Sequence, residues 1–268
     1  MELTSLDQIN QQYRQIYFQP HFDDAVLSCG GSIGLQTATG NRVLVVTVFG
    51  GIPAAGTRSN AFVAQTLQNM GLSTDAAEAV RQRRAEDQAA VESLGADVLR
   101  LDYLDAIFRG DPAYYQGDDA LFGGVNPADL SLDEELAKIF LSIHERAPLA
   151  ALYAPLGVGH HVDHQLCCSA ADRLAQRKLN VKFYEDFPYV TNSGALAARQ
   201  RELNMTMEAE MVEISGMTRQ KAEAVALYRS QVPSLFGSED KMTKALNGYS
   251  GSIRKTQPGI MIERYWRW

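Results

Sequence analysis

Residues 15–49 read QIYFQPHFDDAVLSCGGSIGLQTATGNRVLVVTVF, and this stretch decides the fold class. Gln15–Pro20 is predicted to form a short buried strand, and the small and apolar residues of Phe22–Thr39 recur at helical spacing. Asn41–Phe49 carries the β-branched run VLVVTVF, which is typical of a strand buried on both faces. A strand, a helix and a second strand with short connections indicate a βαβ unit and therefore a parallel sheet.

The same alternation continues along the chain. Three more strands are predicted, each preceded by a helix: helices Ala76–Leu94, Ser131–Arg146 and His161–Lys178, and strands Asp97–Leu101, Leu149–Ala154 and Val181–Glu185. We therefore expect an α/β fold, a Rossmann-like three-layer sandwich with a mostly parallel sheet. Two long segments follow strands, a loop with one helical turn at Gly50–Asp75 and a loop at Asp102–Asp129. Both are expected at the rim formed by the carboxyl ends of the strands.

The alternation of strands and helices ends after about residue 190. Met207–Ser215 is predicted to be an added strand and Gly216–Ser230 a helix, followed by an aromatic and polar tail to Trp268. The chain shows no internal repeat and no linker at which it could be divided. We predict that residues 1–268 form one domain with a C-terminal elaboration from about residue 190.

Composition excludes several classes of function. The 268 residues are 46% hydrophobic and 21% charged, which is ordinary for a globular protein. The net charge of -7 argues against nucleic-acid binding, and no stretch approaches the ~20 apolar residues of a membrane helix. The polar N-terminal residues lack the apolar core of a signal peptide. An odd, sparse set of three cysteines suits a reducing compartment, so a cytoplasmic location is expected. Homo-oligomer formation is left open.

Four of the five histidines lie in two acidic clusters, His21-Phe22-Asp23-Asp24 and His160-His161-Val162-Asp163-His164. Each cluster follows a predicted strand and opens a predicted helix. Both are therefore expected at the carboxyl ends of parallel strands, where open α/β sheets build their sites. His21 and Asp24 are three residues apart, as are His161 and His164, so each pair shares a helix face.

These residue types point to a divalent metal. A catalytic zinc uses three protein ligands and keeps one position open for water, and His21, Asp24 and His164 would supply such a set. Other divalent ions accept the same ligands. With Asp24 on the metal, Asp23 can take a proton from water, and His161 is left to donate to a developing oxyanion. Asp163 can accept a hydrogen bond from an imidazole and hold its tautomer. The alternative is that Asp23 or Asp24 is only a helix N-cap.

The two clusters resemble the signatures of the LmbE-like (PIG-L) family of zinc-dependent N-acetylglucosaminyl deacetylases. The resemblance extends from about residue 15 to residue 231. It includes Cys29-Gly30-Gly31, the run Arg83-Arg84-Ala85-Glu86, the strand end Leu101–Asp105 and the late run Lys221–Tyr228 with Ser230 and Gln231. Three positions depart from the family pattern, Phe22, Ala25 and Val162, and none of them is a ligand.

The resemblance implies a role for each matching residue. His21, Asp24 and His164 correspond to the metal ligands, Asp23 to the general base, His161 to the histidine that stabilises the oxyanion and Asp163 to the acid beside it. Arg83 and Asp105 fall where the family contacts sugar hydroxyls, in competition with Arg81, Arg84 and Asp102. The implied function is zinc-dependent removal of an acetyl group from the nitrogen of an N-acetylglucosamine-type conjugate, a small molecule. The alternatives are a metal-dependent hydrolase of another amide or ester and a non-catalytic carbohydrate-binding relative.

Overall fold

The computed structural model describes residues 1–54, 60–254, 257 and 259–268. Its described strands form one sheet in the order β1-β4-β3-β2-β5-β6-β8-β7. The pairs from β1 to β6 are parallel, whereas β8 is antiparallel to both β6 and β7. The strands are β1 (Glu2–Leu3), β2 (Tyr13–Gln19), β3 (Arg42–Thr47), β4 (Asp97–Arg100), β5 (Ala151–Pro155), β6 (Val181–Tyr184), β7 (Glu208–Glu213) and β8 (Ile262–Arg267).

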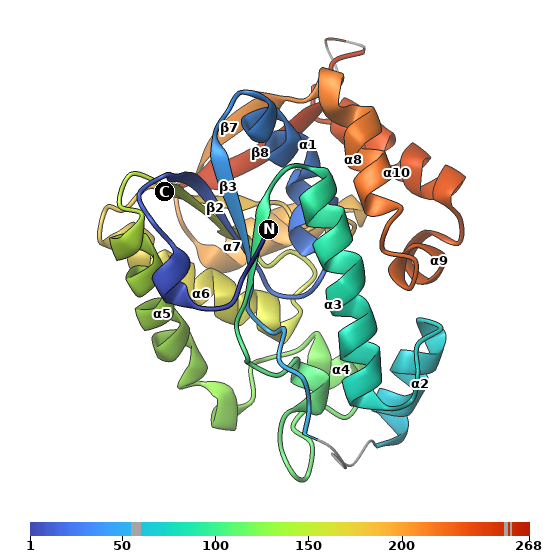
Figure 1. Ribbon diagram of the computed structural model, residues 1–268. Coiled ribbons are helices and arrows are strands. Elements are labelled where there is room, and N and C mark those ends of the chain that lie inside the picture. The colour runs from blue at the N-terminus through green and yellow to red at the C-terminus, as the bar shows by residue number, and fades with distance from the viewer. Residues whose placement is uncertain (55–59, 255–256, 258) are drawn as a thin grey trace.

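Helices cover both faces of this sheet (Figure 1). On one face α1 (Asp24–Ala38) and α3 (Ala76–Ser93) pack against α8 (Thr218–Val225), and on the other α5 (Leu132–Arg146) packs against α6 (Val162–Gln176). The remaining helices are α2 (Ala61–Asn69), α4 (Asp118–Leu121), α7 (Ala195–Leu203), α9 (Gln231–Phe236) and α10 (Glu239–Ser252). The predicted α/β class with a mostly parallel sheet is confirmed. The β-branched strand β3 is buried along most of its length, as its sequence predicts.

The order of the strands creates a switch point between β2 and β5. From β2 the chain moves outward through α1 to β3, whereas from β5 it moves in the opposite direction through α6 to β6. The loops that leave β2 and β5 therefore diverge and open a crevice beyond the carboxyl ends of these two strands. The two histidine clusters follow β2 and β5 directly, so the topology brings them together.

Gly31 shows why the small residues of α1 are needed. A Cβ atom at this position would lie 2.6 Å from the side chain of Ile214 and 3.0 Å from an oxygen of Glu263. The amides of Gly31 and Ser32 instead donate to the Glu263 carboxylate at 2.9 and 2.8 Å. Close packing against Ile214 and Glu263 therefore explains the glycine at position 31.

Several elements differ from the predictions, because α4 lies in the predicted loop Asp102–Asp129 and α9 and α10 lie in the predicted tail. The segment predicted as a loop with one helical turn contains the nine-residue helix α2, which Asn60 caps by accepting a hydrogen bond from the Val63 amide. Residues 55–59 of that predicted loop lie outside the described residues. The tail contains β8, which inserts between β6 and β7. The hydrophobic pattern of a strand is hard to recognise in β8, because Glu263 places a charged side chain at a buried position. Glu263 is buried because it pairs with Lys221 at 2.7 Å.

Candidate active site

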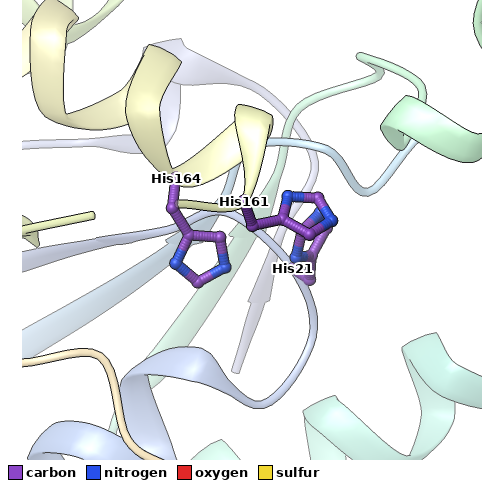
Figure 2. Close-up of side chains that lie close together, drawn as sticks. All are labelled: His21, His161 and His164. Carbon is purple, nitrogen blue, oxygen red and sulfur yellow. The ribbon is translucent and has the colours of Figure 1, made fainter. Parts of the chain in front are cut away.

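The two clusters meet beyond the carboxyl ends of β2 and β5. His21 lies in the turn between β2 and α1, and His161 and His164 lie at the start of α6 (Figure 2). The ring centroid of His21 is 4.7 Å from that of His161 and 5.4 Å from that of His164. All six predicted residues of the clusters are buried. Residues separated by some 140 positions thus form one compact group, as the strand-end argument predicts.

Asp24 lies between two of these histidines. Its Oδ2 is 3.6 Å from Nδ1 of His21 and 3.4 Å from Nε2 of His164. Two imidazole nitrogens and a carboxylate oxygen are ordinary zinc ligands. Among the described residues, ligand atoms also gather within 4.8 Å in the trios His21, His161, His164 and His21, Asp105, Asp163. His21 belongs to every one of these groups.

The far nitrogen of each histidine beside Asp24 is held by a second carboxylate. Nδ1 of His164 lies 2.7 Å from Oδ1 of Asp186, and Nε2 of His21 lies 2.9 Å from Oδ2 of Asp163. Carboxylates on the outer nitrogens orient metal-binding imidazoles and raise their basicity. Asp186 was missed by sequence reasoning. Its one signal is its position just after β6, at the same edge of the sheet as the two clusters.

The electrostatics at this position favour a cation. Burial disfavours the protonated form of His21, but Asp105, Asp163 and Asp24 outweigh it and raise the pKa of His21 to about 9. Burial likewise opposes protonation of His164, and Asp24 and Asp186 reverse this and raise its pKa. A field that draws protons onto two buried imidazoles also favours a divalent ion, so the donor set fits a metal.

Asp163 supports the site from behind rather than facing its cavity. Its side chain is fully buried, and Oδ2 accepts the Ala106 amide at 2.9 Å in addition to contacting His21. Its Oδ1 lies 2.7 Å from NH1 of Arg109, which also binds Asp129 through Nε at 2.8 Å. The imidazole whose tautomer Asp163 is predicted to hold is therefore that of His21. Arg109 was missed because it lies in a long connection with no regular pattern.

Asp23 adopts an unusual backbone conformation. Its φ angle is 106°, a region that side chains other than glycine rarely occupy, and such strain is typical of functional positions. Burial and the neighbouring Asp24 raise the pKa of Asp23 to about 8, although Arg83 opposes this shift. NH2 of Arg83 is 3.8 Å from Oδ2 of Asp23. The side chain does not cap α1, which removes the N-cap alternative for this residue.

The tautomer of His161 follows from its place at the start of α6. Its Nδ1 accepts a hydrogen bond from the backbone amide of Asp163 at 3.2 Å. Burial, followed by the nearby His21, lowers the pKa of His161 well below the ordinary value, so the ring is neutral. With Nδ1 accepting, the proton lies on Nε2, which is then a hydrogen-bond donor. His161 also lines the cavity.

The structure shows which of the neighbouring arginines and aspartates line the cavity. Arg83 lines the cavity and donates to the carbonyl of Phe22 at 3.0 Å, whereas Arg84 binds the carbonyl of Gly50 outside it. Asp105 lines the cavity with Oδ2 3.7 Å from Nε2 of His21. Asp102 is exposed and pairs with Arg84.

A cavity with about 1080 Å³ of empty space, counted to its open mouth, lies over these groups. Six predicted site residues line it: His21, Asp23, Asp24, Arg83, Asp105 and His161. Side chains of α2 and of the 105–122 segment also line it, which confirms for the described residues that both long connections border the site.

Comparison with known proteins matches residues 16–175 to the PIG-L family, described as GlcNAc-PI de-N-acetylase. The match covers more than half of the chain. The protein belongs to the PIG-L family. The resemblance inferred from the two clusters is thereby confirmed. The PIG-L segment runs from within β2 almost to the end of α6 and contains all eight predicted site residues, whereas Asp186 lies beyond it.

Several proteins that are similar to this chain are deacetylases. A 2'-N-acetylparomamine deacetylase from Niallia circulans is 32% identical over 255 residues, covering 90% of this chain and 88% of the relative. A 2'-N-acetylparomamine deacetylase from Streptomyces fradiae is 30% identical over 224 residues, covering 81% and 73%. A solved structure of the zinc-inhibited form of teicoplanin deacetylase matches with a TM-score of 0.78 and 28% identity, over 94% of this chain and 97% of that one.

Proposed function

We propose that this protein is a metal-dependent N-deacetylase that hydrolyses the acetamide of an N-acetylated amino-sugar conjugate. The observation that carries the proposal is the convergence of Asp24 with Nδ1 of His21 and Nε2 of His164, next to the strained and buried Asp23. The prediction of an N-deacetylase agrees with the family and with both curated relatives, whose names specify removal of an N-acetyl group. The zinc-inhibited state of the teicoplanin enzyme supports zinc as an ion that this kind of site binds.

His21, Asp24 and His164 would hold the metal. When bound, a zinc ion would act as a Lewis acid that polarises an amide carbonyl and lowers the pKa of water. Asp163 and Asp186 orient the two imidazoles from their outer nitrogens. This assignment places the metal at the carboxyl ends of β2 and β5, as the sequence predicts.

The remaining residues carry the proton transfers. With a cation bound beside it, Asp23 would be ionised and would accept a proton as water adds to the amide carbon. His161 would donate a hydrogen bond from Nε2 to the carbonyl oxygen as negative charge develops there. The carbon–nitrogen bond then breaks, and the proton held by Asp23 is available to the departing amine. Arg83 and Asp105, on the cavity wall beside these groups, are positioned to bind sugar hydroxyls.

The test is a panel of N-acetylglucosamine glycosides with the purified, zinc-loaded protein. Release of acetate and free amine in equal amounts supports the proposal, and Asp23→Asn should abolish it. Asp102→Asn is the matched control, because Asp102 is exposed and does not line the cavity. Hydrolysis only of unrelated amides or esters would favour the broader hydrolase alternative. Tight binding without acetate release would favour a non-catalytic carbohydrate-binding relative.

We also infer that residues 1–268 act as one LmbE-like domain. The C-terminal elaboration is part of the same sheet, since β8 pairs with β6. Three free, buried cysteines support a reducing, cytoplasmic location. Among the described residues no helix is long and apolar enough to cross a membrane.

A further inference from the structure

A second hydrophobic cluster lies apart from the main core. It is built from α2, from the 106–122 segment and from the start of α6, and its buried members include Val63, Leu67, Ile107, Leu121 and Val162. The main core instead follows the sheet and the helices that cover it. The second cluster therefore belongs to the two long connections that surround the site, not to the framework of the fold.

Several large apolar side chains packed on this cluster are only partly buried, because they face the cavity. Phe62 lies in α2 and Met70 directly follows this helix, and Phe108 and Phe122 come from the 105–122 segment. Leu235 of α9, which is 38% exposed, lines the same cavity. We call these five residues the apolar wall. Exposed apolar groups gathered in a concave site usually mark the part of a ligand that is itself apolar.

The apolar wall begins at the reaction centre. The ring of Phe122 stands edge-on to the imidazole of His161, with centroids 5.3 Å apart and planes at 85°. The same cavity also presents polar groups, among them His21, Asp23 and Arg83. A sugar ring with several hydroxyls finds hydrogen-bond partners among these groups and very few among the five side chains of the apolar wall.

We propose that the apolar wall binds a hydrocarbon or aromatic aglycone of the amino-sugar conjugate. This inference rests on the proposed deacetylase function, because the acyl group removed is then an acetyl. A single methyl group cannot account for a cavity whose lining side chains are mostly apolar and come from α2, the 105–122 segment and α9. The apolar space is therefore assigned to the group joined to the other end of the sugar.

The first test is the dependence of activity on aglycone length. Methyl, butyl, hexyl and octyl glycosides of N-acetylglucosamine are compared at concentrations below micelle formation, with detection of the free amine. Each buried methylene should raise kcat/KM about fourfold, mainly through a lower KM. Equal kcat/KM for the methyl and octyl glycosides would overturn the proposal. So would a stronger dependence on N-acyl length, since the wall would then hold the acyl chain.

Two variants localise the effect. Leu235→Gln places an amide on the wall from α9, and Met70→Gln places one from the end of α2, with little change in volume. Each should lower the octyl-to-methyl ratio of kcat/KM by about fourfold or more, the value of one buried methylene. The matched controls are Leu149→Gln and Met205→Gln, at exposed positions outside the cavity, which should leave the ratio unchanged. Equal ratios in wall and control variants would refute the assignment.

Binding is measured separately so that the two proposals can fail independently. Titration calorimetry compares octyl and methyl β-glucosides, which carry no acetamide. Tighter binding of the octyl compound that is lost in Leu235→Gln supports the apolar wall even if no glycoside is deacetylated, and in that case only the proposed function falls. Equal affinities with normal deacetylation would overturn the apolar wall alone.

Discussion

Arg109→Met tests whether the long connection after β4 holds the metal site in place. The guanidinium bridges two buried carboxylates, Asp163 at 2.7 Å and Asp129 at 2.8 Å, and its side chain is only 9% exposed. Removing one partner of a buried ion pair costs about 3–5 kcal/mol, because the remaining charge stays unpaired. With an unfolding entropy of about 2.1 cal/mol/K per residue, the Tm should fall by about 5–9 °C.

The second expected effect is on metal binding. Arg109 holds Asp163, and Asp163 holds Nε2 of His21. Loss of such an orienting partner typically costs about 10–100-fold in metal affinity. Zinc affinity is measured by competition with a chromophoric chelator, at a temperature where both proteins are folded.

Lys221→Met provides the matched control for this experiment. Lys221 forms a buried ion pair with Glu263 at 2.7 Å, so its loss should also destabilise the fold by several kcal/mol. It contacts none of the histidines or aspartates of the site. We expect a similar decrease in Tm for both variants, with reduced zinc affinity only for Arg109→Met. Unchanged zinc affinity in Arg109→Met would refute the argument that Arg109 positions His21.

Three further predictions follow from the site and the fold. Asp24→Ala should lose the metal, whereas Asp23→Asn should keep it while kcat falls by about 10²–10⁴-fold; metal content and turnover decide this, and the reverse pattern would exchange the two roles. Chelation should abolish deacetylation and added zinc should restore it, so full activity in metal-free protein would contradict the mechanism. Burial disfavours the charged form of Asp97, but Arg42 and the Tyr13 hydroxyl outweigh it and lower the pKa of Asp97. Its stabilising effect is therefore complete above about pH 4 and is lost as the pH falls through the lower pKa of the folded state. In urea unfolding, the stability lost in Asp97→Asn relative to the wild type should be largest at pH 7 and should decrease progressively as the pH falls below about 4.

The sequence by itself predicted the α/β class and the two clusters because both depend on local patterns. A continuous β-branched run such as residues 43–48 is favourable only in a strand covered on both faces. Polar residues placed directly after such strands must lie at the carboxyl edge of a parallel sheet. This reasoning predicts that His21 and His164 lie close together, and their ring centroids are 5.4 Å apart in the structure.

The local patterns did not decide between neighbouring residues of the same type. Arg83 faces the cavity, whereas Arg84 turns to the Gly50 carbonyl, and adjacent positions on a helix differ by about 100° in direction. Which of the two directions meets the site depends on how α3 packs on the sheet. The same holds for Asp105 and Asp102, which lie in a connection without regular periodicity.

Only the tertiary structure decided which residues support the site from behind. Asp163 binds His21, 142 positions away, and Asp186 binds His164 from the end of another strand. A buried charge is favourable only when a partner compensates it, and such partners come from distant parts of the chain. Glu263 shows the same limit, since its burial in β8 depends on Lys221 of α8. Sequence patterns record which face of an element is apolar, whereas the pairing of buried charges is set by the folded arrangement of the elements.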